Sequence, residues 1–488
     1  MVGNNYWQFD SSIKYPPKGV YNPVQKYPEY PFHDEIGEPD TENQVYEAVR
    51  NIFIACGFDV EHFGQKEWNP LGKYISPGNV VLLKPNLVKE ANKQTDNLQK
   101  GLDCMITHPS IVRVLFDYVY LAMKGVGKII IADAPVQGCD FEKLKQNSGY
   151  DMLFQFFKGK EKGNLKIDIA DLRDTVLYMD NGRKRQQHNE SGKYEGMIID
   201  IGSESYFSGI KNGKRFRVTD YAAEDTTAHH CNGKNEYCIS RALLDADVVL
   251  NIVKPKTHRI AGYTAALKNM IGICTKKEYL PHHRQGRTGR GGDEYESTYL
   301  LWKYLNTKGN DIKNWALKRQ YCFVSDMADK FSRRIGILLD HRETERKKFG
   351  FWYGNDTIWR TILDVNHIVY YAGKDGRLHS NQQRRVLHFG DMIVCGEKEG
   401  PLLPAYKMVG GILFSDNPVE FDYCAVKLMG FDYRKIPTIL NAVKDKKLIK
   451  TKTTHIALHS NDKKFHGYVD DIEDDFAFKP SSGWNNYL

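Results

Sequence analysis

Lysine, asparagine, aspartate and histidine side chains follow three apolar runs of the sequence, at the points where buried strands are expected to end. They are Lys84 and Asn86 after the first run, Asp133 after the second, and Lys254, Lys256 and His258 after the third. In open parallel sheets ligands bind beyond the carboxyl ends of the strands, so these side chains are expected to line one crevice. Lysines attract phosphate or carboxylate, and histidine titrates near neutral pH. The combination predicts a site for a small anionic ligand.

The spacing of the third group strengthens this prediction. Lys254, Lys256 and His258 alternate by two, so an extended backbone would present all three on one face. His108, in the loop before a long helix, and His258 are candidate acid–base residues, because a facing pair could remove a proton from a carbon and return it to the other side. Asp133 would orient one of these groups. The alternative for each is a structural role.

Lys268 and Asn269 are candidates for binding a cofactor, together with Lys254 and Lys256. Both lie on a helix expected after the third apolar run. The Lys268 amine could bond a phosphate or form a covalent link to a carbonyl, and the alternative is a solvated helix lysine.

The remaining candidates concern substrate and metal. Lys84, Asn86 and Asp422 are assigned to substrate, and the alternative for Asp422 is a helix cap. His282 and His283 are candidate ligands for nickel, zinc or copper, and the alternative is a pair of exposed loop histidines. The sequence contains no P-loop and no glycine-rich dinucleotide motif after a strand, which argues against a kinase or a simple dehydrogenase.

Strands alternate with helices along the whole chain. Strands are expected at 80–83, 128–132, 166–170, 248–253, 392–396, 411–415 and 454–459, and helices at 45–56, 110–124, 356–372, 421–429 and 437–443. This alternation predicts an α/β fold with mainly parallel sheets.

Two α/β lobes facing a central crevice are the expected domain organisation. An extended strap rich in Tyr and Pro covers 1–44, the first lobe covers 45–283 with a polar insertion near 174–220, the second lobe covers 295–465, and a polar tail covers 466–488. Residues 284–294, between the lobes, are rich in Arg and Gly. This segment buries little apolar surface and is expected to be mobile.

Composition excludes several classes of protein. The chain has 488 residues and a net charge of +8, which suits a small anion and falls short of a dedicated nucleic-acid binder. Nine cysteines without a CxxC pair indicate neither a disulfide framework nor a zinc ribbon, so a reducing cytoplasm is expected. No apolar run of about 18 residues and no signal peptide are evident, so no membrane partner is expected.

Several segments resemble a widespread prokaryotic family known as domain of unknown function 362. They are 81–87 (VLLKPNL), 107–110 (THPS), 131–135 (IADAP), 245–249 (DADVV), 256–258 (KTH), 267–272 (LKNMIG), 416–422 (DNPVEFD) and 429–432 (MGFD). The family's name concedes that its activity is not established. Some relatives carry a ferredoxin-like domain with clustered cysteines, which this chain lacks.

A shorter stretch is similar to the nickel-pincer nucleotide-dependent lactate racemases. His258 precedes Lys268 by ten residues, with Ala261-Gly262 between them. The resemblance implies that Lys268 tethers a nickel-containing nucleotide cofactor and that His282 or His283 binds the nickel. It also implies that His108 is a second acid–base histidine. The strand tip Lys84-Pro85-Asn86 departs from that family's pattern, which has an arginine there.

The leading hypothesis is a cytoplasmic enzyme that acts on a small anionic metabolite, a hydroxy acid or sugar acid, by proton or hydride relocation. It would be an isomerase or racemase, or an oxidoreductase, with a metal or nucleotide-derived cofactor. One rival is a noncatalytic polyanion- or RNA-binding protein, motivated by basic segments at 182–185, 211–217 and 284–292. Another is an iron–sulfur-linked redox protein, which the scattered cysteines argue against.

Overall fold

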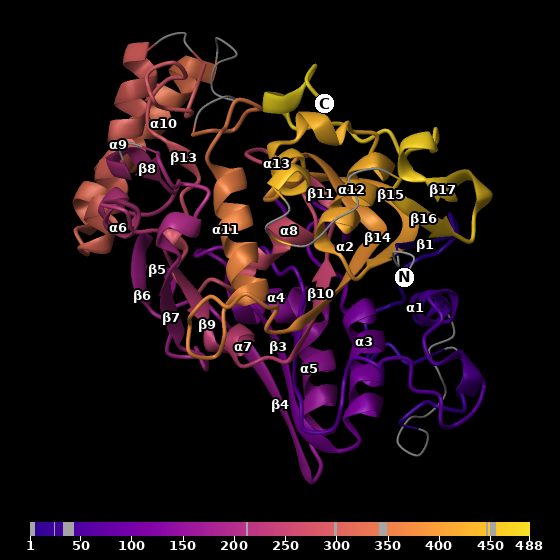
Figure 1. Ribbon diagram of the computed structural model, residues 1–488. Coiled ribbons are helices and arrows are strands. Elements are labelled where there is room, and N and C mark those ends of the chain that lie inside the picture. Colours follow the sequence, from indigo (N-terminus) through magenta and orange to yellow (C-terminus); the bar gives the residue numbers. More distant parts are fainter. Residues whose placement is uncertain are drawn as a thin grey trace.

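The computed structural model describes residues 5–23, 25–32, 43–210, 213–296, 300–340, 349–445, 448 and 455–488 (Figure 1). One large sheet runs through it, with strands in the order β17-β16-β1-β15-β14-β10-β2-β3-β4 and with β11 and β12 attached at β14. Its strands are β1 Tyr6–Phe9, β2 Val80–Lys84, β3 Val126–Asp133, β4 Asn164–Asp171, β10 Val248–Val253, β11 Lys256–His258, β12 Gly262–Thr264, β14 Arg385–Glu399, β15 Leu403–Ser415, β16 Ala457–Ser460 and β17 Gly467–Tyr468.

Helices cover both faces of this sheet. One face carries α1 Gln44–Ala55, α3 Pro109–Met123, α4 Phe141–Ser148 and α5 Tyr150–Lys158, and the other carries α7 Arg241–Leu244, α8 Ala266–Asn269, α11 Ile358–Tyr371, α12 Pro418–Leu428 and α13 Pro437–Asp445. Within β2, Leu82 faces one core, whereas Val81 and Leu83 face the other, as the two-residue period of a strand requires. The predicted α/β class is confirmed.

Strands from both halves of the chain share the one sheet. β14 pairs in parallel with β10, and β10 pairs in parallel with β2 on its other side. β10 is buried along its whole length, because helices cover both faces of the sheet at this point. The structure therefore does not separate the two predicted lobes into two sheets, and the predicted boundaries remain predictions. The expected strands 392–396 and 411–415 are parts of one long antiparallel hairpin, β14 and β15.

The N-terminal strap is attached to the body of the protein through its aromatic residues. β1 pairs with β15 and β16, so part of the strap is a strand of the main sheet. Farther along, the Tyr15 ring stacks on His108 with a centroid separation of 3.9 Å, and the Tyr15 hydroxyl donates to Asp391. These contacts give the strap a structural role.

The polar insertion and two further helices form a smaller region beside the sheet. The insertion contains the hairpin β5 Thr175–Asp180 and β6 Arg183–His188, and the strands β7 Gly196–Asp200 and β9 Glu236–Ser240 pair with each other. α9 Leu300–Lys318 and α10 Cys322–Asp340 lie side by side at the edge of the molecule (Figure 1). This helix pair was not predicted from the sequence. Within the described residues, no helix has the length and apolar character needed to span a bilayer.

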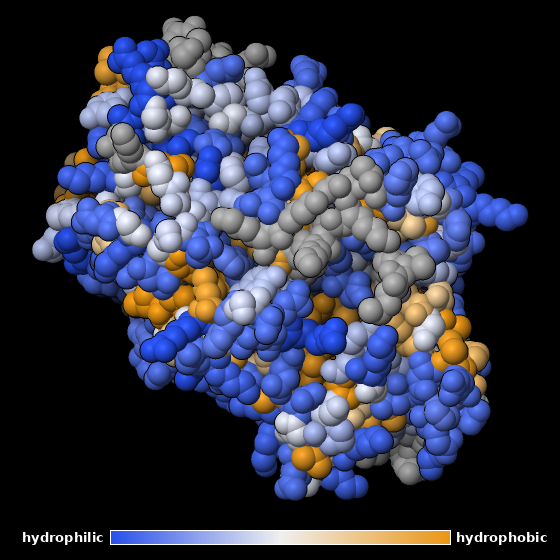
Figure 2. Space-filling view, in the orientation of Figure 1, coloured by the Kyte–Doolittle hydropathy of each residue, from blue (hydrophilic) through white to orange (hydrophobic). Residues whose placement is uncertain are grey.

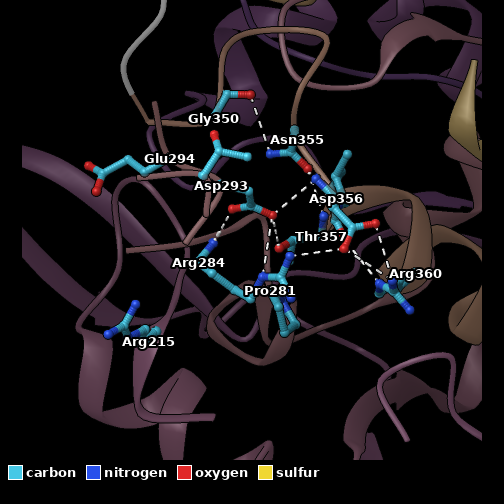
Figure 3. Close-up of polar contacts among 12 residues, drawn as sticks. Arg215, Pro281, Arg284, Asp293, Glu294, Gly350, Asn355, Asp356, Thr357 and Arg360 are labelled. Atoms are coloured by element: carbon cyan, nitrogen blue, oxygen red, sulfur yellow. Dashed lines mark hydrogen bonds and ion pairs between the residues drawn. The ribbon is translucent and has the colours of Figure 1, made fainter. Parts of the chain in front are cut away.

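Both ends of the Arg/Gly segment are held by a polar network (Figure 3). The Asp293 carboxylate is 1% exposed and accepts hydrogen bonds from the backbone nitrogens of Arg284 (2.5 Å) and Asp356 (3.0 Å) and from the Thr357 hydroxyl. The Arg284 guanidinium also pairs with Asp356 at 2.9 Å. The segment that was expected to be mobile thus has anchored ends, because its acidic residues satisfy neighbouring backbone groups and arginines.

Candidate functional site

A cavity of about 860 Å³ opens beyond the carboxyl ends of β2 and β3, beside β11 and α8. Among the residues predicted from the sequence, its lining includes Asn86, Asp133, Lys256, His258, Lys268, Asn269 and His282. The strand ends therefore bring these side chains together, as expected for an open parallel sheet.

A buried ion pair forms the floor beneath this lining. Lys84 Nζ lies 2.7 Å from Asp133 Oδ1, and both side chains are almost completely buried. Lys84 also donates to the Pro85 carbonyl (2.8 Å) and to Asn269 Oδ1 (3.2 Å), while Asp133 Oδ2 accepts from the Leu87 backbone nitrogen (2.6 Å). Both oxygens of Asp133 accept a hydrogen bond and the three Lys84 donors are all used, so the pair positions the loop after β2.

Asparagine side chains connect the ion pair to the cavity. Asn269 Oδ1 accepts from Asn86 Nδ2 at 2.7 Å, and Asn269 Nδ2 donates to Asn251 Oδ1 at 2.7 Å. Asn86 Oδ1 accepts from Lys256 Nζ. This chain fixes the amide orientations and holds Lys256 at the cavity wall.

Six lysines line the cavity without a carboxylate partner among the described residues: Lys89, Lys93, Lys184, Lys256, Lys268 and Lys277. The last three have lowered pKa values. Burial, reinforced by Lys254, lowers the pKa of Lys256 to about 7, and burial, reinforced by Lys277, lowers the pKa of Lys268 to about 7. Burial also lowers the pKa of Lys277, which donates to the Ile271 carbonyl at 3.1 Å. Lys268 has no hydrogen-bond or ion-pair partner in the described part of the chain. The cavity thus concentrates positive charge that an anion would neutralise.

Two cavity histidines are fixed in opposite tautomers by their backbone contacts. His258 Nδ1 accepts from the backbone nitrogens of Ile260 (3.1 Å) and Ala261 (3.2 Å), so the proton of its neutral ring is on Nε2. His282 Nδ1 lies 2.6 Å from the Leu280 carbonyl and must donate to it, which leaves Nε2 as an acceptor. Burial and Lys268 lower the pKa of both rings, that of His282 to about 3, so both are neutral at pH 7. His258 is a hydrogen-bond donor, and His282 is an acceptor or a metal ligand.

Asp422 lies behind the cavity and supports the helix that carries Lys268. Its carboxylate is completely buried and accepts from the Tyr263 hydroxyl (2.5 Å) and from the backbone nitrogens of Ala266 (2.6 Å) and Leu267 (3.2 Å). Ala266 and Leu267 are the first two residues of α8. Asp422 therefore positions Lys268 and does not reach the cavity, so it leaves the predicted substrate set.

Lys254 and His108 belong to a separate buried cluster. Lys254 Nζ lies 2.6 Å from Asp391 Oδ2 and donates to the Val394 carbonyl (2.9 Å). His108 begins α3 as its N-cap, with Nδ1 accepting from the Ser110 backbone nitrogen at 3.2 Å. Neither lines the cavity. The alternation expected for Lys254 and Lys256 fails because the chain leaves β10 at Val253 and β11 begins only at Lys256.

His283 and His282 point in different directions because they are consecutive residues of an extended segment. His283 lies in β13 (His283–Arg284), is 1% exposed and does not line the cavity. Among the described residues, no group of three or more His, Cys, Asp or Glu side chains could hold a metal ion. The cavity offers a metal one imidazole nitrogen, His282 Nε2.

Lys277 is a cavity residue that sequence reasoning missed. It follows the 3-10 turn Met270–Ile273 and lies in the short segment Lys277–Tyr279, with no strand end or motif to distinguish it. Its only sequence signal is proximity to Lys268 and His282 along the chain.

Gly272 allows the backbone to pass directly over the ion pair. A β-carbon at this position would lie 2.0 Å from Asp133 Oδ1 and 2.7 Å from Lys84 Nζ. Gly272→Ala is therefore expected to lower the free energy of unfolding by about 1–3 kcal/mol, measured by urea denaturation. Gly138→Ala is the matched control, because nothing lies within 4 Å of its added carbon. Equal stability of the two variants would contradict the close approach.

Two comparisons with known proteins bear on this site. A family model described as "Domain of unknown function (DUF362)" matches residues 179–427. A protein of Synechocystis sp. (strain ATCC 27184 / PCC 6803 / Kazusa) described as "Thylakoid-associated protein sll1697" is 26% identical over 207 residues. That match covers 42% of this chain and 43% of the relative, so less than half of the relative's length is matched.

Proposed function

Because the chain belongs to the family described as domain of unknown function (DUF362), whose description states no activity, we propose a function from the geometry of its own cavity. The protein is an enzyme that binds a small carboxylate or phosphate compound and moves a proton at a carbon of that substrate. The observation that carries this proposal is that Lys256, Lys268 and Lys277, which have no carboxylate partner among the described residues, line one cavity together with His258 and His282. A cytoplasmic location, expected from the unpaired cysteines, is part of the proposal.

Each cavity residue has a distinct role in this scheme. Lys256 and Lys277 hold the anionic group through charge-assisted hydrogen bonds. Lys268 has a pKa of about 7, so both its forms are present at pH 7: the charged form adds to anion binding, and the neutral form removes the proton. His258 donates from Nε2 to the oxygen on which negative charge develops, as a neutral imidazole can. His282 Nε2 accepts a hydrogen bond from a substrate hydroxyl.

This scheme replaces the predicted pair of His108 and His258 as acid and base. His108 caps α3 outside the cavity, and His258 has its Nδ1 lone pair occupied by backbone amides. Lys268 takes the base role because it alone of the three lysines has no hydrogen-bond acceptor in the described residues. A hydroxy acid or sugar acid remains the proposed substrate class.

Anion affinity is expected to fall as pH rises through 7. Lys256 and Lys268 carry their charges below a pKa of about 7 and lose them above it, so affinity declines by about tenfold per pH unit for each lysine that must be charged. At pH 7 a bound anion favours the charged forms, so binding takes up protons. Calorimetric titration with inorganic phosphate and with lactate, in buffers of different ionisation enthalpy, measures both effects. An affinity that is constant from pH 6 to 8 would contradict the role of these lysines.

A nucleotide-derived nickel cofactor is a second candidate, favoured by the presence of Lys268 and His282 in one cavity. Lys268 would tether the cofactor and His282 would ligate its metal, and the bound group would supply a hydride acceptor. Intact mass spectrometry and nickel analysis of protein from its native host test this candidate. An adduct lost in Lys268→Ala supports it, and unmodified, nickel-free protein rejects it.

The RNA-binding hypothesis is less well supported, because several of its basic residues pair with carboxylates. Arg185 pairs with Asp180, Arg217 with Asp311, and Arg284 with Asp356. Lys211 lies outside the described residues. Fluorescence anisotropy with single-stranded RNA tests this rival, and tight binding with a steep salt dependence would favour it.

A further inference from the structure

The helix pair α9–α10 buries polar and apolar side chains and also exposes many apolar ones. The buried side chains include Asn306, Thr307, Asn314, Ala316 and Leu317 on α9 and Cys322, Ser325, Ala328 and Ile335 on α10. Several large apolar side chains point outward and are 41–65% exposed: Leu301, Tyr304, Ile312 and Trp315 on α9, Tyr321 in the turn, and Phe323, Val324, Met327 and Phe331 on α10. We call these nine residues the outer face. The solvated face of a helix normally carries polar side chains.

Specific hydrogen bonds fix this orientation. Asn310 Nδ2 donates to the Thr219 carbonyl at 2.7 Å, and Asn314 Nδ2 donates to the carbonyls of Thr219 and Tyr221, both at 3.2 Å. Asn306 Nδ2 donates to the Ser332 carbonyl of α10 at 2.9 Å. Rotating either helix to bury the outer face would break these bonds. The outer face is therefore a stable feature of the fold.

The outer face forms one continuous surface. On α9, the outer-face residues lie in one row of positions three or four apart, in which Lys308 fills the gap between Tyr304 and Ile312. On α10, Phe323, Met327 and Phe331 form a similar row. Phe331 approaches Gly309 across the helix pair, and the Trp315 and Tyr321 rings are 5.7 Å apart. Hydrophobic side chains are visible over α9 and α10 at the left edge of the molecule (Figure 2). Exposed apolar side chains gathered on one helix pair mark an interaction site.

Basic residues accompany the outer face. Five basic side chains between residues 301 and 335 are exposed: Lys318, Arg319, Lys330, Arg333 and Arg334. Lys318, Arg319 and Arg333 pair with nearby carboxylates, so Lys330 and Arg334 are the two that have no ion-pair partner in the described part of the chain. The helical period places Arg334 in the row of Met327 and Phe331, and Lys330 in the row of Phe323 and Met327. Asp326 and Asp329 line the cavity together with Arg333, whereas Lys330 and Arg334 do not. The surface is thus both apolar and positively charged.

We propose that the outer face of α9–α10 binds the surface of an anionic lipid bilayer. Aromatic rings and apolar side chains would enter the headgroup region, while long basic side chains reach the lipid phosphates. A second copy of the chain fits less well, because a two-fold contact would bring Lys330 and Arg334 of both copies together, while the Asp326 and Asp329 carboxylates of this pair already contact Arg183 and Arg333. Such a helix pair would lie on the membrane surface, so it does not need the length of a membrane-spanning helix. This inference differs from the prediction made from the sequence, which was that the protein has no membrane partner.

Flotation with lipid vesicles tests the proposal. The full chain is expected to float with vesicles of phosphatidylglycerol and phosphatidylcholine, and to remain unbound with phosphatidylcholine alone. Trp315→Glu/Phe331→Glu, which removes apolar contacts, and Lys330→Glu/Arg334→Glu, which reverses charge, should each weaken binding by about tenfold or more. Tyr468→Glu is the matched control, because Tyr468 is 49% exposed on β17 at the opposite side of the molecule (Figure 1).

Three outcomes would overturn the proposal. One is no binding to anionic vesicles, and another is binding that both double variants retain. The third is a dimer in sedimentation experiments that Phe331→Glu dissociates, which would assign the face to a second copy. All four variants alter exposed side chains, and thermal unfolding checks that each is folded. Anion binding in the cavity is measured on the same variants and is expected to be unchanged, so the two proposals fail independently.

Discussion

Lys84→Met is expected to lower the free energy of unfolding by about 3–5 kcal/mol, because it leaves the Asp133 carboxylate buried without its cation. The Lys84 ammonium is fully buried and contacts Asp133 at 2.7 Å. Urea denaturation followed by circular dichroism measures this loss. The change is isosteric, so lost packing contributes little to it.

A second substitution tests whether the unpaired Asp133 charge causes the loss of stability in Lys84→Met. In Lys84→Met/Asp133→Asn the unpaired charge is gone, while an amide oxygen still accepts from the Leu87 backbone nitrogen. This double variant should recover most of the lost stability. Lys128→Met removes a half-exposed lysine that pairs with Asp168 at 2.9 Å, and should change stability by less than about 1 kcal/mol. A single Lys84→Met variant as stable as Lys128→Met would contradict this account.

Lys256→Met is expected to stabilise the protein and to weaken anion binding about 10- to 100-fold. Lys256 is completely buried and has no carboxylate partner among the described residues, so burial opposes its charge, as its pKa of about 7 shows. Methionine removes this unfavourable charge and preserves the volume. It also removes a charge-assisted hydrogen bond to the anion. Opposite effects on stability and binding are typical of a functional residue.

Differential scanning calorimetry with and without phosphate measures both effects in one experiment. The variant should unfold at a higher temperature than the wild type when no anion is present, and should show little shift when phosphate is added. Lys128→Met, outside the cavity, should retain the shift of the wild type. A lower unfolding temperature together with an unchanged phosphate shift would assign Lys256 to structure alone.

The sequence predicted the strands and several cavity residues because both depend on local patterns. Mainly apolar runs such as 248–253 define strands buried on both faces, and polar residues such as Asn86 and Asp133 lie at the ends of such strands. The sequence could not show that β14 pairs with β10, since a run of residues indicates a strand without indicating its neighbours. The one-sheet arrangement was missed for that reason.

Other residues were placed incorrectly by period or by type. Lys254 and Lys256 diverge because the strand ends at Val253, and the two-residue period holds only within one strand. Pro109 indicated the start of the helix, but the sequence did not show that the preceding His108 accepts a hydrogen bond from the first turn as its N-cap. Tautomers and the lack of a partner for Lys268 are properties of the folded chain, so no sequence pattern could reveal them.

Calorimetric titration of phosphate at pH 6.5 into the wild type and into Lys268→Met tests the central claim most directly. Lys256, Lys268 and Lys277, which line one cavity without a carboxylate partner among the described residues, predict saturable binding to a single site in the wild type. Binding should be weakened at least tenfold in Lys268→Met, with the thermal stability of that variant equal to or above that of the wild type. Absence of saturable binding in the wild type, or equal affinity in a folded Lys268→Met, would contradict the claim that this cavity is an anion site.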